Sequence, residues 1–430
     1  NDTILDDVDT DENNDGKSDV DADHDGLIDI DSLDKLNAMR FQLQGVGLQL
    51  TDVSLLEVSG CPFVIFQGAH QQRCSGYELT QNLDFDTNGN GEVDSQDAYW
   101  NANGQGIGEG WLPVGDDDIN SSFTALFNGN GYAIKNLTIN RPRTEYVGLF
   151  GFIENARVES LAIAGTHSSV VGYERVGALV GYATFSQVSN IAIAANVQGQ
   201  RFVAGLVGSL STGSVENSFV SGSVRGNTYI GGLVGSSGWF SSIGQSLSTS
   251  IVTGNGNAGG LIGSVNNSVI INSYWVTDTS TQLESSETSE ANSYVGLNLS
   301  ALQCAVAENT DSSTGCVSVD GSIEGLDGPV VLYKNWDPAI WDFGTEPNAN
   351  QQLPGLKLNG LVLRDGDGDG VLDQDDKWPN NRAVSQDFDD DGYPDAWSLG
   401  CDDACIQNSG LTLDHFPRHA WAALDARIIT

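Results

Sequence analysis

A tetrapeptide that recurs along the middle of the chain decides the fold: Gly148-Leu149-Phe150-Gly151, Ala178-Leu179-Val180-Gly181, Gly205-Leu206-Val207-Gly208, Gly232-Leu233-Val234-Gly235 and Gly260-Leu261-Ile262-Gly263. Successive copies are offset by 30, 27, 27 and 28 residues. A period near 28 residues is typical of one supersecondary unit that stacks on its neighbours. Because such units bury their apolar side chains only against the next copy, the repeat predicts a solenoid.

Apolar residues recur at fixed places after each tetrapeptide. The first column is Val158, Val188, Val215, Ile243 and Ile270, and the second is Ile163, Ile193, Val220, Leu247 and Trp275. The runs between them are short, alternate with a period of two, and are interrupted by Gly, Asn and Ser, as strands with tight corners are. We therefore expect an all-β protein, a right-handed parallel β-helix with about three strands per coil.

A polar column accompanies the apolar ones, two residues after the first column. It consists of Ser160, Asn190, Asn217, Gln245 and Asn272. Amides stacked at one place in successive coils can bond to their equivalents above and below, so the pattern predicts a structural ladder.

Both ends of the solenoid are expected to be covered. A helix capped by Asp31 or Ser32, with an apolar face of Leu33, Leu36, Met39, Arg40 and Leu43, is predicted to close the first end. Large side chains are predicted to finish the other end: Trp336, Ile340, Trp341, Phe343, Leu353 and Leu356.

Composition divides the chain into three regions. Residues 1–31 are Asp-rich, residues 32–360 hold the capping helix and the β-helix, and residues 361–430 are Asp-rich again. Within the middle region, residues 77–85 and 123–139 predict two earlier coils. The Ser-, Thr- and Glu-rich residues 277–328 predict an excursion from the coil.

The best acidic motif lies at residues 86–97. Its oxygen-bearing side chains Asp86, Asn88, Asn90, Asp94 and Asp97 stand at positions 1, 3, 5, 9 and 12, with Gly91 at position 6 and a carbonyl from Glu92 at position 7. This is the spacing of an EF-hand or dockerin-type calcium loop, in which six to eight oxygens converge from a short arc.

Four related loops follow the same spacing. Their candidate ligands are Asp11, Asn13, Asp15 and Asp19; Asp21, Asp23, Asp25 and Asp29; Asp365, Asp367, Asp369, Val371, Asp373 and Asp376; and Asp387, Asp389, Asp391, Tyr393 and Asp395, with Val371 and Tyr393 as carbonyl ligands. A solvated acidic linker is the alternative for any one loop. Five copies favour about five Ca²⁺ ions, which would cancel ten negative charges. The neighbouring aromatic residues Trp378, Trp397 and Phe416 are expected to pack onto these turns or, alternatively, to stack on a sugar.

The repeats resemble those of known surface proteins. Over residues 77–275, the Gly-Leu-Phe/Val/Ile-Gly units resemble the GLUG motif of bacterial surface proteins, and the Asp-rich loops are similar to thrombospondin type 3 repeats. The resemblance implies a β-helix and a secreted or cell-surface location, but it implies no reaction. We expect the host to be a Gram-negative bacterium.

Charge and cysteines limit the partners and the compartment. The net charge of −40, from 58 acidic and 18 basic residues, argues against nucleic acid and anionic membranes. The six cysteines fall into the close pairs Cys61/Cys74, Cys304/Cys316 and Cys401/Cys405, which predict three local disulfides and an oxidising compartment. The sequence begins at Asn1 without Met or an apolar leader, so we expect that any signal peptide has already been removed or is not part of this sequence.

The sequence favours a structural role over catalysis. It shows no G-x-S-x-G or H-E-x-x-H motif, its close carboxylates lie mainly in the acidic loops, and Arg141, Arg143, Arg175, Arg201 and Arg225 are interpreted as surface charges. We expect an adhesion or assembly module whose partners are neighbouring subunits, a cell surface or a glycan. The alternatives are a filament or surface-layer subunit and, in another class, a β-helix polysaccharide lyase or hydrolase.

Overall fold

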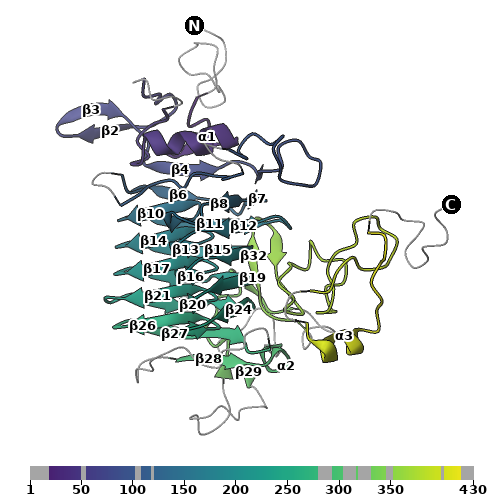
Figure 1. Cartoon of the computed structure of the whole chain (residues 1–430). Helices are drawn as coiled ribbons and strands as arrows, with labels where there is room; N and C mark the ends of the chain where they lie inside the picture. The colour runs from purple at the N-terminus through teal and green to yellow at the C-terminus, as the bar shows by residue number, and fades with distance from the viewer. Residues whose placement is uncertain are drawn as a thin grey trace, which may run out of the picture.

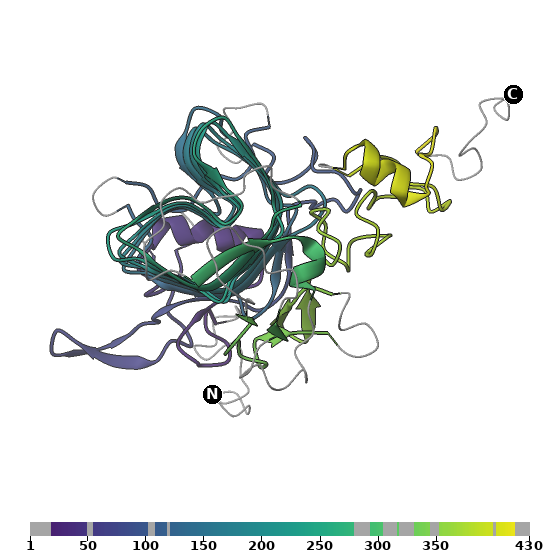
Figure 2. The same ribbon diagram turned by 90° about the horizontal axis from the view of Figure 1, so that it is seen from below.

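A parallel β-solenoid forms the body of the protein (Figure 1). The computed structural model describes residues 19–49, 55–101, 108–117, 121–278, 293–303, 316–317, 331–344, 352–398 and 401–417. Each coil contributes strands to three parallel sheets, which Figure 2 shows stacked in projection. Of the helices in these ranges, none is long and apolar enough to cross a membrane.

The strands of the three solenoid sheets have the following bounds. The large sheet contains β1 (Ile28–Ile30), β4 (Gly76–Leu79), β5 (Leu83–Asp84), β6 (Leu126–Asn128), β7 (Ala133–Lys135), β8 (Thr138–Asn140), β11 (Arg157–Ala164), β12 (Ser169–Val171), β15 (Gln187–Gln198), β18 (Ser214–Glu216), β19 (Phe219–Gly226), β22 (Ser242–Gly244), β23 (Leu247–Ser248), β24 (Ile251–Gly254), β27 (Val269–Val276) and β28 (Ser293–Leu297). The motif sheet contains β10 (Phe150–Glu154), β14 (Val180–Thr184), β17 (Val207–Ser211), β21 (Val234–Gly238) and β26 (Ile262–Asn266). The short sheet contains β9 (Glu145–Val147), β13 (Glu174–Gly177), β16 (Arg201–Ala204), β20 (Thr228–Gly231) and β25 (Ala258–Gly259).

The remaining elements lie outside the coils. They are the hairpin β2 (Phe63–Phe66) and β3 (Ala69–Gln72), the pair β29 (Cys316–Val317) and β30 (Val331–Leu332), the antiparallel sheet β31 (Trp341–Asp342), β32 (Gly355–Leu358) and β33 (Leu361–Leu363), and the helices α1 (Leu33–Ala38), η2 (Met39–Phe41), α2 (Leu299–Leu302) and α3 (Asp403–Ser409).

The tetrapeptides stack as predicted. Phe150, Val180, Val207, Val234 and Ile262 are in register across the motif sheet. The Leu of each tetrapeptide and the whole first column are buried in one continuous core. The second column is wrong at one place, because the register aligns Ser248, not Leu247, with Val220 and Trp275.

The corners of the coils are made by residues with left-handed backbone. Ser160, Asn190, Asn217, Gln245 and Asn272 have φ between 44° and 56°. The predicted amide ladder is not what unites them: Asn190 Oδ1 has no hydrogen-bond partner, Asn217 Oδ1 accepts from Trp341 Nε1 at 3.4 Å, and Asn272 Nδ2 donates to Lys334 O at 3.4 Å. Asn recurs here because it tolerates the left-handed region better than most residues do.

The N-terminal end is closed by helix α1, with Ser32 as its cap. Leu33 and Leu36 are buried in the solenoid core, as predicted. The preceding strand β1 pairs in parallel with β4, so residues 28–30 belong to the large sheet and the division drawn at residue 31 does not follow the structure. Similarly, the division at residue 361 falls within the β32–β33 pair.

The predicted C-terminal lid lies on the side of the solenoid instead of its end. Trp336, Trp341 and Leu356 are fully buried, but they pack on outward residues of the large sheet such as Phe219 and Leu247. Figure 1 shows β32 beside β15 and β19, on the flank of the solenoid. The physical reason is that this face of the sheet is apolar and needs a cover. At the end itself, β28 adds a parallel strand to β27, so part of the predicted excursion continues the coil.

The described cysteines are all disulfide-bonded. Cys61–Cys74 and Cys401–Cys405 have Cα separations of 4.9 and 5.3 Å. Cys316 is also disulfide-bonded, while its predicted partner Cys304 lies outside the described residues. Disulfides fit an oxidising compartment.

Candidate metal sites

The four described acidic loops share one turn. The carboxylates of Asp21, Asp86 and Asp387 accept hydrogen bonds from the N–H groups four and five residues later. Asp365 accepts from Gly368 and Gly370, at 2.8 and 3.1 Å. The glycine at position 6 of each loop has φ between 84° and 99°, which explains why this position is glycine in every copy.

The side chain at position 5 of each loop stabilises the second half of the turn. Its side chain accepts a hydrogen bond from the N–H of position 7, in the pairs Asp25/Leu27, Asn90/Glu92, Asp369/Val371 and Asp391/Tyr393. The backbone at Glu92, Val371 and Tyr393, predicted to supply carbonyl ligands, is thereby fixed next to the acidic side chains.

The closing contact differs among the loops. In three loops the carboxylate at position 9 accepts from the N–H of position 2, as Asp29 from Ala22, Asp373 from Gly366 and Asp395 from Phe388. In the loop of residues 86–97, position 12 takes this part: Asp97 accepts from Thr87 N at 2.7 Å and from Asp94 N at 2.8 Å. Burial acts to raise the pKa of Asp97, but its hydrogen bonds to Asp94, Asn88 and Thr87 lower it overall.

Carboxylates converge in three of the loops. Oxygens of Asp21/Asp23/Asp25, Asp365/Asp367/Asp369 and Asp387/Asp389/Asp391 lie within 4.8 Å of one another in each group. The middle group is buried throughout, with exposures of 0%, 6% and 4% for Asp365, Asp367 and Asp369. We call these three residues the buried triad.

The electrostatics of the buried triad require compensation. Burial, and then repulsion from Asp369, raise the pKa of Asp365 to about 8 and that of Asp367 to about 9. Burial also raises the pKa of Asp376, in the same loop, to about 7, and that of Asp21 in the N-terminal loop to about 6. Adjacent buried carboxylates stay ionised only if a cation lies among them, and otherwise they take up protons.

The donor set of the buried triad fits a hard cation. Asp367 Oδ1 accepts a hydrogen bond from Asp369 N, but Asp367 Oδ2 is buried without a hydrogen-bond partner. All the converging side-chain atoms are carboxylate oxygens, the ligands that Ca²⁺ and Mg²⁺ prefer. An oriented, unsatisfied carboxylate oxygen in a buried site is costly unless it has such a ligand.

The loop of the buried triad also joins the solenoid to the described residues that follow β33, which we call the C-terminal segment. Thr249, which follows β23, donates from Oγ1 to Asp365 Oδ2 at 2.8 Å. A Cβ on Gly370 would lie 3.2 Å from the Cα of Gly222 in β19, so the two backbones approach closely. Ser398 Oγ donates to Asp369 Oδ2 at 2.7 Å and ties in the following loop.

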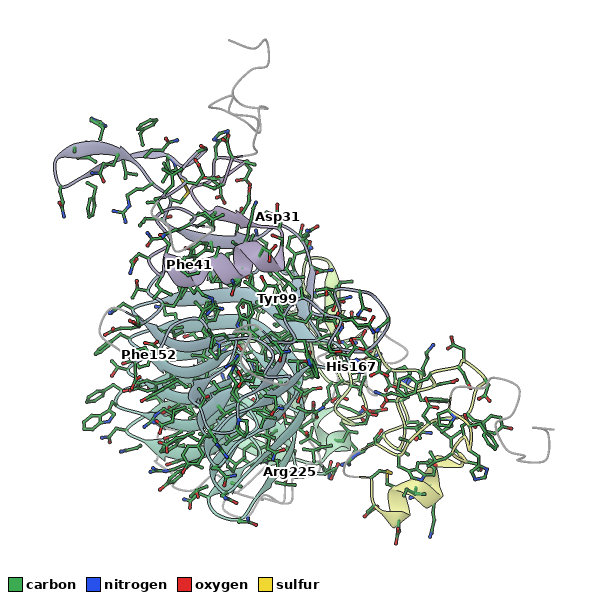
Figure 3. The ribbon with its side chains drawn as sticks, turned by 45° about the horizontal axis from the view of Figure 1, so that its top comes forward. Asp31, Phe41, Tyr99, Phe152, His167 and Arg225 are labelled. Carbon is green, nitrogen blue, oxygen red and sulfur yellow. A yellow bond between two sulfur atoms is a disulfide. The ribbon has the colours of Figure 1, made fainter. Side chains whose placement is uncertain are left out.

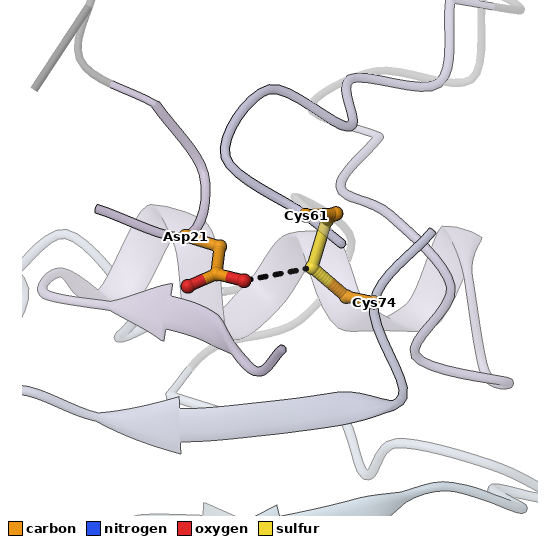
Figure 4. A group of neighbouring side chains, drawn as sticks. All are labelled: Asp21, Cys61 and Cys74. Carbon is orange, nitrogen blue, oxygen red and sulfur yellow. Dashed lines mark hydrogen bonds between the residues drawn. A yellow bond between two sulfur atoms is a disulfide. The ribbon is translucent and has the colours of Figure 1, made fainter. Parts of the chain in front are cut away.

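The N-terminal loop is fixed in a different way. Asp21 lies 3.6 Å from Cys74 Sγ (Figure 4). Because the sulfurs of Cys61 and Cys74 are bonded to each other and cannot act as thiolate ligands, these three residues do not form a metal centre. The disulfide instead holds residues 58–61 over the loop, where Val20 N donates to Ser59 O at 3.1 Å. The loop then leads directly into β1.

Some predicted residues have a different outcome. Asp11, Asn13 and Asp15 lie outside the described residues, and Asp19 is buried at the start of the described chain. Arg141, predicted to be a surface charge, is buried: its guanidinium donates to Trp111 O and Gly110 O and pairs with Glu109 at 3.2 Å. Arg141 thus satisfies backbone carbonyl groups of the loop that contains Gly110 and Trp111.

A cavity of about 210 Å³ separates part of the C-terminal segment from the solenoid. Trp397, Asp369 and Ser398 line one side, and Asn196 and Ser223 line the other. Of the three aromatic residues considered for sugar stacking, Trp397 is the one among the cavity-lining residues.

Comparisons with known proteins reach only parts of the chain. No family model matches it. A segment of 88 residues, 20% of this chain, is 40% identical to 10% of a protein described as a Gly-rich membrane protein from Evansella cellulosilytica. A segment of 124 residues, 29% of this chain, is 29% identical to 1% of halomucin from Haloquadratum walsbyi. The chain thus spans a tenth or less of the length of these relatives.

A solved structure also resembles the chain weakly. It is a candidate immunoglobulin A1 protease from Bacteroides ovatus, with 15% identity and a TM-score of 0.38 over 79% of this chain and 95% of that chain. A score at this level carries no argument about activity.

Proposed function

We propose that this chain is an extracellular, calcium-braced structural module of a cell surface, in which Ca²⁺ holds the C-terminal segment against the β-solenoid. The buried triad carries this proposal, because it combines three buried carboxylates with a direct contact to the solenoid through Asp365 and Thr249. The disulfides and the partial similarity to a protein named as a membrane protein support a location outside the cytoplasm.

Adhesion or assembly is the use that a stiff, acidic solenoid supports best. Catalysis is the weaker proposal: within the described ranges, the groups of three acidic side chains close enough to share an ion lie in the loops. For self-assembly into filaments, the supporting observation is the β2–β3 hairpin, whose Phe63 and Ile65 are 73% and 71% exposed. Sedimentation velocity in calcium tests self-assembly. A protein that stays strictly monomeric at high concentration would exclude filament formation.

Removing calcium tests the brace. In excess chelator, limited proteolysis should cut within residues 365–398 and release the C-terminal segment, while the solenoid core survives. In millimolar calcium the same sites should be protected, because the loops close around the ion. Equal digestion in both conditions would contradict the proposal, and NaCl at matched ionic strength is the control.

Calcium binding should release protons at neutral pH. In chelator, the raised pKa values of about 8 and about 9 keep Asp365 and Asp367 largely protonated at pH 7. Their folded pKa exceeds the unfolded value, so the chelated fold loses stability as pH rises from about 4 to about 9, and calcium affinity increases over the upper part of this window. Titration calorimetry in two buffers of different ionisation enthalpy measures the release; identical heats would refute it.

A further inference from the structure

Aromatic side chains protrude from one corner of the solenoid without packing against it. At the end of β21, Trp239 and Phe240 are 64% and 81% exposed, and Phe185 occupies the same corner two coils earlier with 59% exposure. Trp239 and Phe240 both have positive φ, 53° and 64°. Left-handed backbone costs about 1–2 kcal/mol for each residue that is not glycine.

The coil has an additional residue at this corner. Gly238 aligns with Ser211, and Ser242 aligns with Ser214, so three residues stand at the corner where the preceding coil has two. The backbone is firmly held, since Trp239 N donates to Asn266 O and Phe240 N donates to Asn267 O at 3.1 and 2.8 Å. The insertion therefore displays two rings on a rigid support.

A floor of hydroxyl groups adjoins these rings. Ser209, Ser236 and Ser264 are in register on the outer face of the motif sheet, and Ser211 lies two residues along β17. All four are partly exposed. Each strand of five residues spans about 13 Å, and neighbouring coils lie about 4.8 Å apart. We call this surface, with Trp239 and Phe240 at its edge, the neutral face.

Stacked rings border the opposite edge. Phe202 and Tyr229 stack with centroids 5.1 Å apart and planes inclined by 9°. In the preceding coils the equivalent corner residue Tyr146 lies 5.9 Å from Phe152, which marks the outer face of the motif sheet in Figure 3. Because the coils repeat, Phe202 and Tyr229 lie beside Ser209 and Ser236.

Among the described residues, charged groups adjoin this surface only at the edge formed by Phe202 and Tyr229. Arg201 lies over these two rings, 4.4 and 5.6 Å from their centroids, and Arg175 lies 5.4 Å from the centroid of Phe202. Both guanidinium groups pair with Glu174, at 2.8 Å from Arg175 and 3.8 Å from Arg201. Residues 226–277 include no Asp, Glu, Lys, Arg or His, in a chain whose net charge is −40.

An anionic ligand would have to compete with Glu174 for Arg175 and Arg201, and a cationic ligand would meet their positive charge. A protein partner would favour a contiguous apolar patch over a row of serines. Rings at two edges with hydroxyls between them suit a ligand that has apolar C–H faces and many hydroxyl groups.

We propose that the neutral face binds an uncharged polysaccharide chain. This goes beyond the proposed function by naming the ligand class, and it depends on that function only for an extracellular location. The rings stack on sugar faces, while Ser209, Ser236 and Ser264 exchange hydrogen bonds with sugar hydroxyls. The calcium loops take no part in the contact.

Native gel electrophoresis in calcium tests the proposal, using gels that contain hydroxyethyl cellulose, galactomannan or dextran, with polygalacturonate as the charged comparison. We expect a neutral polysaccharide to retard the protein, and the double variant W239A/F240A to weaken that binding at least tenfold. Phe388→Ala, which removes a ring of 57% exposure in the C-terminal segment, should bind like the unmodified chain.

Three results would overturn the proposal: retardation by none of the neutral polysaccharides, unchanged binding by W239A/F240A, or equal loss in Phe388→Ala. Self-association that W239A/F240A abolishes in sugar-free buffer would also overturn it and assign the face to a protein contact. Protease protection by calcium, measured on the same samples, shows independently whether the brace holds.

Discussion

Asp367→Ser should change the stability of the C-terminal segment in opposite directions with and without calcium. In calcium, the variant loses a carboxylate ligand, and the segment should be less stable by about 1–3 kcal/mol, the range expected when ligand occupancy falls substantially. In chelator, it loses a buried carboxyl group whose raised pKa costs the folded segment stability at pH 7, so the segment should be unchanged or more stable. The Ser hydroxyl can still accept from Asp369 N, as Asp367 Oδ1 does.

Thermal melting and limited proteolysis, each in calcium and in chelator, measure this reversal. Asp375→Ser is the matched control, because Asp375 lies in the same loop but is exposed and outside the buried triad. A purely structural Asp367 would give the same sign in both conditions, and that result would refute a cation at this site.

The sequence was sufficient for the solenoid because its signal is periodic. Glycines and aliphatic residues spaced about 28 apart can satisfy one another only by stacking, and the register of the motif sheet follows. The error at Leu247 has a local cause: the inward position five residues after Ile243 holds the polar Ser248, whereas the apolar Leu247 faces outward and packs under the lid. A slip of one residue exchanges inward and outward side chains.

The position of the C-terminal lid had a signal that alternation alone does not use. All four residues from Leu161 to Ala164 are apolar in the sequence and buried in the structure, which is the pattern of a strand covered on both faces. Such a run predicts a second layer over the large sheet, and Trp336, Trp341 and Leu356 supply it. Sequence reasoning assigned these side chains to an open end because it considered only the inner face of each coil.

The loops were predictable in outline but not in environment. The Asp and Gly spacing specifies the turn, since position 1 must accept two N–H groups and position 6 must have positive φ. It does not distinguish the exposed loop of residues 86–97 from the buried triad, whose burial depends on contacts with Thr249 and Gly222 more than a hundred residues earlier. Burial by distant segments is a tertiary property with no local pattern.

The final glycine of each tetrapeptide gives the second large effect, and Gly208→Ala should destabilise the solenoid by about 3 kcal/mol. A Cβ at Gly208 would lie 2.5 Å from Val176 N and 2.7 Å from Arg175 C, at the left-handed corner of the previous coil. The same approach recurs at Gly181, Gly235 and Gly263, so the glycine is required by the distance between two backbones and not by its own φ.

Gly238→Ala is the matched control for that substitution. Gly238 lies in the neighbouring strand β21 of the same sheet, and the nearest atom to its added Cβ is Asn266 O at 3.7 Å, an ordinary contact. We expect a change within about 0.5 kcal/mol there. Guanidinium unfolding in calcium measures both variants, and equal midpoints would show that close packing against the corner does not explain the glycine. The atoms that a Cβ at Gly208 would meet belong to the backbone, which cannot rotate away as a side chain can. The loss of stability in Gly208→Ala should therefore not be relieved by a local change of side-chain conformation.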